Sequence, residues 1–372
     1  MRRSLPGVPD LRLGALRAPL RLAGRVQSIA TNVGLKVIPR IPASAKRLLS
    51  GGRSVTVDGN TLDPTLQLML TAQRAAGING LVVDDDPTAS RAQARQVCLG
   101  FGGPQIHVEV TEMSLPGPAG NIPARHYHPG SAEPAPLLVF YHGGGWVIGD
   151  LDTHDALCRL TCRNAEVQVL SIDYRLAPEH PAPAAVDDAY AAFRWAHDHA
   201  ADLGAIPGKV AVGGDSAGGN LAAVVSQLAR DDGSPTPVLQ WLIYPVTDCT
   251  AQTRSRTLFA DGCVLTKHDI DWFTAQYLDG SALASTDPRV SPLLADDLSG
   301  LPPALITVVG FDPLRDEGER YATALGAAGN AVDRRCFGSL THAFANFFPL
   351  GGGSATATAE LISALRAHLS RA

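Results

Sequence analysis

The sequence lacks several features that would place it in particular classes of protein. Charged residues make up only 18% of the 372 residues and hydrophobic residues 45%, which is not the composition of a disordered chain. No apolar run reaches the roughly 18 residues that a membrane-spanning helix needs, so we expect no integral membrane segment. The apolar core of a secretory signal is also missing, because the N-terminus is interrupted by Arg12, Arg17, Arg21 and Arg25.

Closely paired cysteines are absent as well. No C-x-x-C pair occurs among the six cysteines, which are Cys98, Cys158, Cys162, Cys249, Cys263 and Cys336. Histidine and cysteine do not cluster at the spacing of metal ligands, so we expect neither a metal site nor another cofactor. We interpret the cysteines as free thiols of a reducing compartment, which favours a cytoplasmic location.

Positive charge is scarce overall but concentrated at the N-terminus. The net charge of −5 argues against a general nucleic-acid binder. Residues 1–57 nevertheless contain eleven Lys or Arg and a single acid, Asp10. We assign residues 1–60 to a basic extension that is either poorly ordered or able to touch an anionic surface, which leaves peripheral membrane association open.

The order of predicted elements indicates an α/β fold. Residues 105–110 and 122–128 alternate polar and apolar side chains with period two, which predicts antiparallel strands. From residue 136 onward, apolar strands alternate with helices, and this order implies a mostly parallel central sheet flanked by helices on both faces. We assign residues 105–245 and 304–372 to this core.

Two segments outside the core predict a helical cap. The first comprises residues 61–104, which carry two predicted helices. The second comprises residues 246–303, an insertion that is far longer than a connection between core elements needs and is typical of a lid. We expect a substrate pocket built from Trp146 and the bulky rings of the insertion, which are Phe259, Trp272, Phe273 and Tyr277.

A serine stands among glycines at residues 213–220, with the sequence GGDSAGGN. The pattern G-x-S-x-G follows a predicted strand and precedes a predicted helix, which is the context of a nucleophile elbow. Glycines two residues before and after the serine let strand and helix converge. A phosphate-binding loop is the rival interpretation, but no G-K-[ST] and no correctly spaced G-x-G-x-x-G is present.

A second glycine motif and two later residues complete the pattern. Three glycines follow an apolar strand in FYHGGGWVIGD at residues 140–150, which is typical of an oxyanion loop. A serine hydroxyl needs a base to take its proton, and His342 follows the last predicted strand. Asp312 ends the strand before it. The chain order Ser, Asp, His is that of α/β-hydrolases.

The chain resembles the hormone-sensitive-lipase-like (family IV) bacterial carboxylesterases, which have the α/β-hydrolase fold, and among them the actinobacterial lipase-like esterases. The resemblance spans about residues 60–370 and is carried, in order, by HGGGW, DYRLAPEHPAPAAVDDAY, GGDSAGGN, SGLPPALI, DPLRDEG and LTHAF. It implies that Ser216 is the nucleophile, Asp312 the triad acid and His342 the base. It also implies an oxyanion hole formed by Gly144, Gly145 and Ala217, with Gly143 in the same loop.

The activity that the resemblance implies is that of a serine carboxylesterase. It would hydrolyse short- to medium-chain acyl esters through an acyl-enzyme, with a small-molecule ester as its partner and homodimer formation left open. Two alternatives also remain open: an amide hydrolase or deacetylase on the same triad, and a non-catalytic ligand-binding protein of the same fold. Ala343 departs from the family pattern, where glycine follows the histidine, so we expect reduced or redirected activity.

A charged motif near the centre of the chain looks catalytic at first sight. We interpret Asp173, Arg175 and Glu179 instead as a buried network that supports the loop beneath the site.

Overall fold

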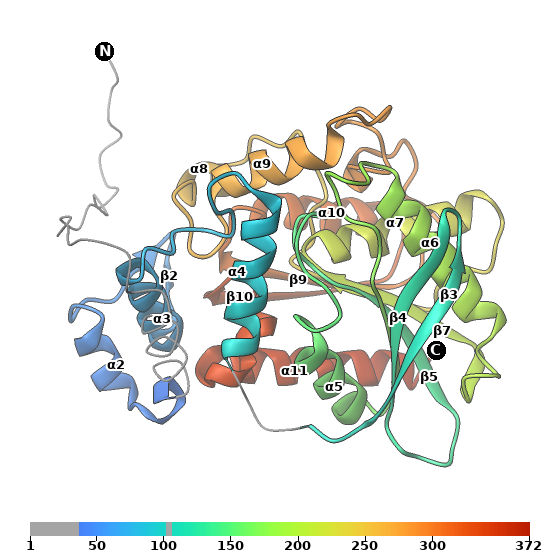
Figure 1. The fold of residues 1–372 in the computed structure, drawn as a ribbon, viewed down its shortest axis with the longest axis horizontal. Coiled ribbons are helices and arrows are strands. Elements are labelled where there is room, and N and C mark those ends of the chain that lie inside the picture. The colour runs from blue at the N-terminus through green and yellow to red at the C-terminus, as the bar shows by residue number, and fades with distance from the viewer. Residues whose placement is uncertain (1–36, 102–105) are drawn as a thin grey trace.

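The protein is described here by a computed structural model that covers residues 37–101 and 106–372. Its centre is an eight-stranded sheet in the order β10-β9-β8-β7-β5-β6-β4-β3 (Figure 1). Strands β10 to β6 pair in parallel, whereas β4 and β3 are joined antiparallel at one edge. The strands are β3 (Glu109–Gly117), β4 (Gly120–His128), β5 (Ala135–Tyr141), β6 (Gln168–Ile172), β7 (Ala205–Asp215), β8 (Gln240–Ile243), β9 (Ala304–Phe311) and β10 (Val332–Thr341). The predicted α/β-hydrolase fold with a mostly parallel sheet is confirmed.

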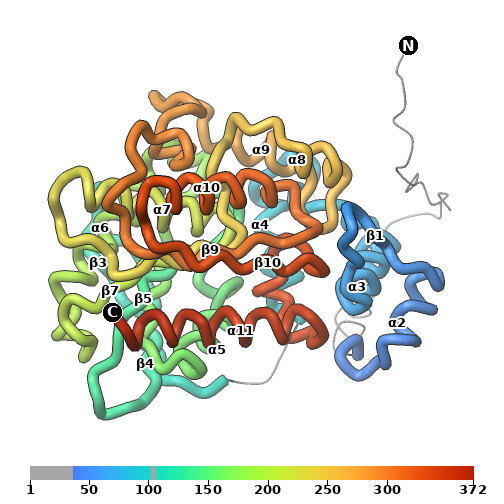
Figure 2. The backbone as a smooth tube through the Cα atoms, turned by 180° about the vertical axis from the view of Figure 1, so that it is seen from behind, coloured from blue at the N-terminus to red at the C-terminus, as the bar shows by residue number. Residues whose placement is uncertain are grey.

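Helices cover both faces of this sheet. One face packs against α6 (Ala184–Asp198), α7 (Ala217–Asp231) and α10 (Arg315–Ala327), and the other against α5 (Asp155–Ala165) and α11 (Gly352–Leu369). Figure 2 shows α5 and α11 close together from behind. Alternate residues of β5 enter the two cores, with Val139 on one side and Phe140 on the other. A strand that is buried on both faces needs apolar residues at nearly every position, which explains the continuous apolar run in the sequence of β5.

The predicted cap lies over the carboxyl ends of the strands (Figure 1). It consists of α3 (Pro64–Ala75), α4 (Pro87–Gly100), α8 (Arg254–Leu258) and α9 (Lys267–Leu278). Asp269, which is buried, joins its two sequence segments: the carboxylate accepts the amides of Leu81 and Val82 and completes a capping box with Thr266 at the start of α9. The two segments are therefore tied together by one side chain.

The described part of the predicted N-terminal extension contains regular secondary structure. It forms η1 (Ile38–Arg40), α2 (Ala43–Leu49) and a hairpin of β1 (Thr56–Val57) and β2 (Asn60–Thr61). Asp58 in the hairpin turn pairs with Arg254 of α8 at 2.6 Å and with Arg315 of α10 at 3.0 Å. This end of the extension thus contacts both the cap and the core, while residues 1–36 lie outside the described part of the chain.

The motif around Asp173 does not form the single network that the sequence suggested. Arg175 instead pairs with Asp188 of α6 at 2.8 Å, and Glu179 pairs with Arg91 of α4 at 2.6 Å. The physical reason is that the chain turns within the motif, so that its charged residues face different helices. The interpretation of one shared network is therefore wrong.

Within the two described ranges, no helix is long and apolar enough to cross a bilayer. Over the same residues, no three His, Cys, Asp or Glu side chains converge as metal ligands would. All six cysteines are free thiols.

Candidate active site

Ser216 occupies the sharp turn between β7 and α7. Its backbone is strained, with φ 56° and ψ −117°, a conformation that an L-residue adopts only when its surroundings enforce it. A side chain on Gly214 would overlap the backbone of Gly218, and one on Gly218 would overlap the carbonyl of Tyr141. The glycines of the motif are therefore required by the close approach of strand and helix.

His342 lies between Ser216 and Asp312 and contacts both. Its Nε2 is 2.9 Å from Oγ of Ser216, and its Nδ1 is 2.8 Å from Oδ2 of Asp312. All three side chains are buried, with exposed fractions of 8%, 3% and 1% for Ser216, His342 and Asp312. Because a carboxylate can only accept, Nδ1 carries the proton and Nε2 is free to take one from the serine.

The sheet brings these residues together from distant parts of the chain. Ser216 follows β7, Asp312 follows β9 and His342 follows β10, and the carboxyl ends of parallel strands meet at one edge of a sheet. Asp312 is fixed by the amide of Leu314, which donates to its Oδ1 at 2.8 Å. The ring of Tyr244 packs against that of His342 with 4.6 Å between centroids. Both partners of the serine are thus held in place by neighbours.

The glycine loop after β5 approaches Ser216 from the opposite side. Gly144 and Gly145 have φ of 127° and 59°, and side chains there would overlap the backbone of Ile148 and the ring of Phe273. No acceptor among residues 37–101 and 106–372 faces the amides of Gly144, Gly145 or Ala217. These three amides are available to a ligand.

Gly143 differs from the other residues predicted for the oxyanion hole. Its amide donates to Oδ1 of Asp215 at 2.8 Å, and a side chain at this position would overlap the same carboxylate. The amide is therefore committed to the protein and is not free for an oxyanion. Gly143 therefore belongs to the predicted oxyanion site as part of its loop and not as a donor.

A largely apolar cavity opens above Ser216. Two of the predicted pocket residues, Trp146 and Phe273, line it. Phe259, Trp272 and Tyr277 do not: Tyr277 stacks behind Trp146 at 4.3 Å, Phe259 packs on Phe311, and Trp272 packs on Phe273. These three rings form the packed support of the cap rather than the cavity wall, because helix and loop directions turn them away from it.

The N-terminal helices of the predicted cap supply further residues of the cavity wall. The sequence prediction missed them because it named only aromatic residues. Leu70 of α3 and Ala94, Val97 and Cys98 of α4 face the cavity. The α4 residues recur at the i, i+3, i+4 spacing of one helix face, which is the signal that would have indicated them. Ala343 also borders the cavity, with its backbone in the left-handed region at φ 62°.

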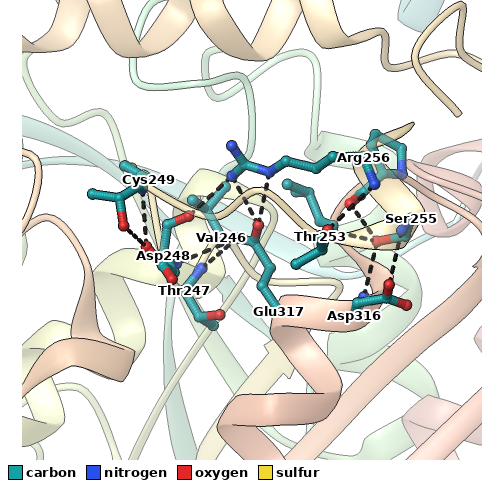
Figure 3. A network of polar contacts seen from close by, with 12 residues as sticks. Val246, Thr247, Asp248, Cys249, Thr253, Ser255, Arg256, Asp316 and Glu317 are labelled. Carbon is teal, nitrogen blue, oxygen red and sulfur yellow. Dashed lines mark hydrogen bonds and ion pairs between the residues drawn. The ribbon is translucent and has the colours of Figure 1, made fainter. Parts of the chain in front are cut away.

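A buried polar network holds the root of the cap insertion to the helix that follows Asp312 (Figure 3). The carboxylate of Glu317 in α10 accepts the amides of Thr247 and Asp248, just after β8, and pairs with Arg256 of α8. Arg256 also donates to the carbonyl of Asp248 at 2.9 Å. Next to this pair, Oδ2 of Asp316 accepts the Ser255 amide at 2.8 Å. The insertion and the segment after Asp312 therefore share their anchors.

Residues 138–346, more than half of the chain, match the alpha/beta hydrolase fold family. The chain belongs to this family, and its predicted resemblance to the hormone-sensitive-lipase-like branch is confirmed. It is 70% identical to the carboxylic ester hydrolase LipN of Mycobacterium tuberculosis over the full length of both chains. It is 38% identical to an ethyl acetate hydrolase of Pseudomonas putida, covering 70% of this chain and 83% of the relative.

A solved structure leads to the same family. The ester hydrolase EH1AB1 from the metagenome of Lake Arreo, solved with a derivative of bipyridine phosphonate, is 41% identical to this chain. The two superpose with a TM-score of 0.78, covering 83% of this chain and 99% of that one.

Proposed function

We propose that Ser216, His342 and Asp312 are the catalytic triad with which this protein hydrolyses carboxylic esters. The protein is a serine carboxylesterase, as its family and its full-length identity to an ester hydrolase indicate. The observation that carries the assignment of the residues is the buried chain of hydrogen bonds from Ser216 Oγ through the His342 ring to Asp312. These three residues are sufficient to supply the nucleophile, the base and the acid that orients the base.

The reaction follows from the positions of these atoms. Ser216 Oγ attacks the ester carbonyl while Nε2 of His342 takes the hydroxyl proton, and the Asp312 carboxylate stabilises the resulting imidazolium. The carbonyl oxygen becomes an oxyanion that accepts hydrogen bonds from Gly144, Gly145 and Ala217. The carbon–oxygen bond to the alcohol breaks, and His342 returns its proton to the departing alkoxide. Water then repeats the same steps on the acyl-enzyme and releases the carboxylic acid.

The lining of the cavity favours acyl chains of moderate length. Each buried methylene contributes about 0.8 kcal/mol while the cavity has room, so the rate first rises with chain length. Phe273, Trp146 and the α4 face close the space, and the relative from Pseudomonas putida is named for an ester with a two-carbon acyl group. We therefore propose substrates with about two to eight acyl carbons, because longer chains would have to displace the packed cap.

The alternatives differ in what they require. A non-catalytic binding protein would have no use for a histidine aligned between serine and acid, so the contact between His342 and Ser216 favours an enzyme. An amide hydrolase could use the same triad, and the names of the relatives favour esters. A cytoplasmic location and a homodimer stay predictions from the sequence.

The test is a series of p-nitrophenyl esters from acetyl to palmitoyl, with Ser216→Ala as the blank. We expect kcat/KM to peak within the two- to eight-carbon range and to fall by several orders of magnitude in the variant, because members of a triad act as a unit. A fluorophosphonate should label wild-type protein at Ser216 only. Label at another residue, or turnover retained by Ser216→Ala, would reassign the nucleophile. A peak at twelve carbons or more would refute the proposed chain length.

A further inference from the structure

A second carboxylate–histidine pair lies behind the glycine loop, and the proposed mechanism gives it no task. Asp215, which directly precedes Ser216, is 2% exposed. Its Oδ1 lies 3.1 Å from Nε2 of His154, at the start of α5, and also accepts the Gly143 amide at 2.8 Å. A buried carboxylate beside a site where an oxyanion forms is costly unless a cation balances it.

Asn346 connects this carboxylate to the segment that carries the base. It belongs to η3 (Phe344–Leu350), which begins two residues after His342, and its Nδ2 lies 3.3 Å from Oδ2 of Asp215. One carboxylate therefore contacts three segments: the elbow of which it is part, the glycine loop through Gly143, and the turn after His342. A small shift of Asp215 would change the position of the loop relative to Ser216.

Both ring nitrogens of His154 lie within hydrogen-bond distance of polar atoms of the protein. Nε2 lies 3.1 Å from Oδ1 of Asp215 and 3.3 Å from Nδ2 of Asn346, so it faces one acceptor and one donor. Nδ1 lies 3.0 Å from Oγ1 of Thr153, whose single proton is donated to the carbonyl of Asp150 at 2.8 Å. Nδ1 is thereby placed to donate to Oγ1 of Thr153. The ring of His154 is therefore fixed beside the carboxylate of Asp215, in the geometry that an ion pair between the two side chains needs.

The pKa of Asp215 agrees with an ionised carboxylate. Burial opposes its ionisation, but the charge and hydrogen bond of His154 and the amide of Gly143 lower the pKa overall.

The other titratable groups near the pair carry no competing charge. The ring of His142 is 5.6 Å from that of His154, and burial together with the charge of His154 lowers the pKa of His142 to about 4. Burial raises the pKa of the Cys98 thiol to about 12 and that of Tyr244 above its ordinary value. Asp150, beyond Thr153, is paired with Arg95 of α4. These groups are thus either neutral or paired with residues other than Asp215 and His154.

We propose that Asp215 and His154 form a positioning ion pair that holds the Gly143–Gly145 loop where its free amides meet the oxyanion formed at Ser216. The inference rests on the proposed role of Ser216. Such a pair acts on the transition state more than on the bound ester, because the loop amides bond strongly only to the charged oxygen. Loss of the charge of either partner should therefore lower kcat and leave KM nearly unchanged.

The experiment compares two inhibitors on the wild type and on His154→Gln and Asp215→Asn. A trifluoromethyl ketone adds to Ser216 and forms an oxyanion, whereas the methyl ketone of the same chain length binds without doing so to any large extent. His154→Gln keeps a donor towards Asp215 and removes the charge. His199→Gln is the matched control, since His199 is half-buried, stacks on Trp195 and donates only to its carbonyl.

We expect the preference for the trifluoromethyl ketone to fall about 10- to 100-fold in both variants, less than the ~10²- to 10³-fold cost of deleting an oxyanion donor. The kcat for an ester should fall in parallel, with KM within about twofold of wild type. His199→Gln should match the wild type in all three quantities.

Three results would overturn the inference. A lower Tm with an unchanged ketone preference would make the pair a purely structural feature. Equal weakening of both ketones would mean that it shapes the cavity and not the oxyanion site. Wild-type behaviour of His154→Gln would show that the charge is not needed. If the wild type itself shows no preference for the trifluoromethyl ketone, or if Ser216→Ala retains turnover, the proposed function fails instead.

Discussion

Arg256 and Glu317 form an ion pair that is closed off from solvent, with 2.8 Å between Nη2 and Oε2 and exposed fractions of 5% and 0% (Figure 3). Arg256 belongs to the predicted cap insertion, and Glu317 stands five residues after Asp312, the proposed triad acid, in α10. The pair therefore couples the position of the cap to that of the acid. Replacing either residue would leave the other as a buried charge without a partner and with unsatisfied hydrogen-bonding groups.

Glu317→Gln should destabilise the protein by about 3–5 kcal/mol, the range for breaking a buried ion pair on one side. The measurement is urea-induced unfolding at pH 7.5. Glu319→Gln serves as the control, because Glu319 lies on the same helix, is partly exposed and pairs with Arg334 at the surface, where a pair contributes about 0–1 kcal/mol. Equal losses for the two variants would mean that the burial of the Arg256–Glu317 pair has no energetic consequence.

Asp173 should make stability depend on pH. Burial, together with the nearby charges of Asp150 and Asp152, raises the pKa of its carboxyl to about 6 in the folded protein. The folded state then holds a proton that the unfolded state has released, so the contribution of this group to stability is present at acidic pH and lost as pH rises through about 6. Asp173→Asn, which cannot ionise, should show a higher Tm than the wild type at pH 7.5.

The control for Asp173→Asn is the same comparison of the two proteins at a lower pH. At pH 4 the wild-type carboxyl is already protonated, so the difference in Tm between the two proteins should nearly vanish. A difference that is constant from pH 4 to pH 8 would show that packing, not ionisation, separates the variant from the wild type.

The motif DPLRDEG contains two aspartates that geometry separates. Asp312 contacts His342 at 2.8 Å, whereas Asp316 accepts the amide of Ser255 and the side chain of Arg315. Asp312→Asn should lower kcat by about 10⁴-fold, because an amide at this position favours the wrong tautomer of the histidine. Asp316→Asn should change kcat far less and act mainly on stability. Steady-state kinetics of both purified variants decide the matter, and a reversed order of losses would reassign the acid.

The parts of the site that were predictable from the sequence are those set by short motifs at strand ends. Ser216, Asp312 and His342 each follow an apolar strand, and the alternation of strands and helices forces those ends to one edge of the sheet. The glycines around Ser216 were informative because only glycine tolerates the close approach of the turn. In these cases the local geometry of the chain was sufficient to predict the site residues.

The direction in which a side chain faces, and the contacts between distant segments, were not predictable from the sequence. Phe259 and Tyr277 are large and apolar, as wall residues often are, but the fold turns one onto Phe311 and the other behind Trp146. The commitment of the Gly143 amide to Asp215 depends on a contact between segments 72 residues apart. Such facts follow from how elements pack and leave no periodic signal in the chain.

Ala343 offers the last test, because it combines backbone strain with a position at the cavity. Its φ of 62° lies in the left-handed region, where a methyl side chain costs free energy that glycine does not pay. Ala343→Gly should therefore raise the free energy of unfolding by about 0.5–1 kcal/mol, reduced by the greater freedom of glycine in the unfolded chain. The methyl group also borders the cavity beside His342, so its removal should raise kcat/KM for esters of branched alcohols relative to ethyl esters. Urea unfolding and a paired ester panel measure the two effects.

The matched control is Ala345→Gly. Ala345 is buried two residues further on and has no positive φ, so this variant should only lose stability. A loss of stability in Ala343→Gly as large as that of the control would show that the left-handed backbone carries no strain at this position.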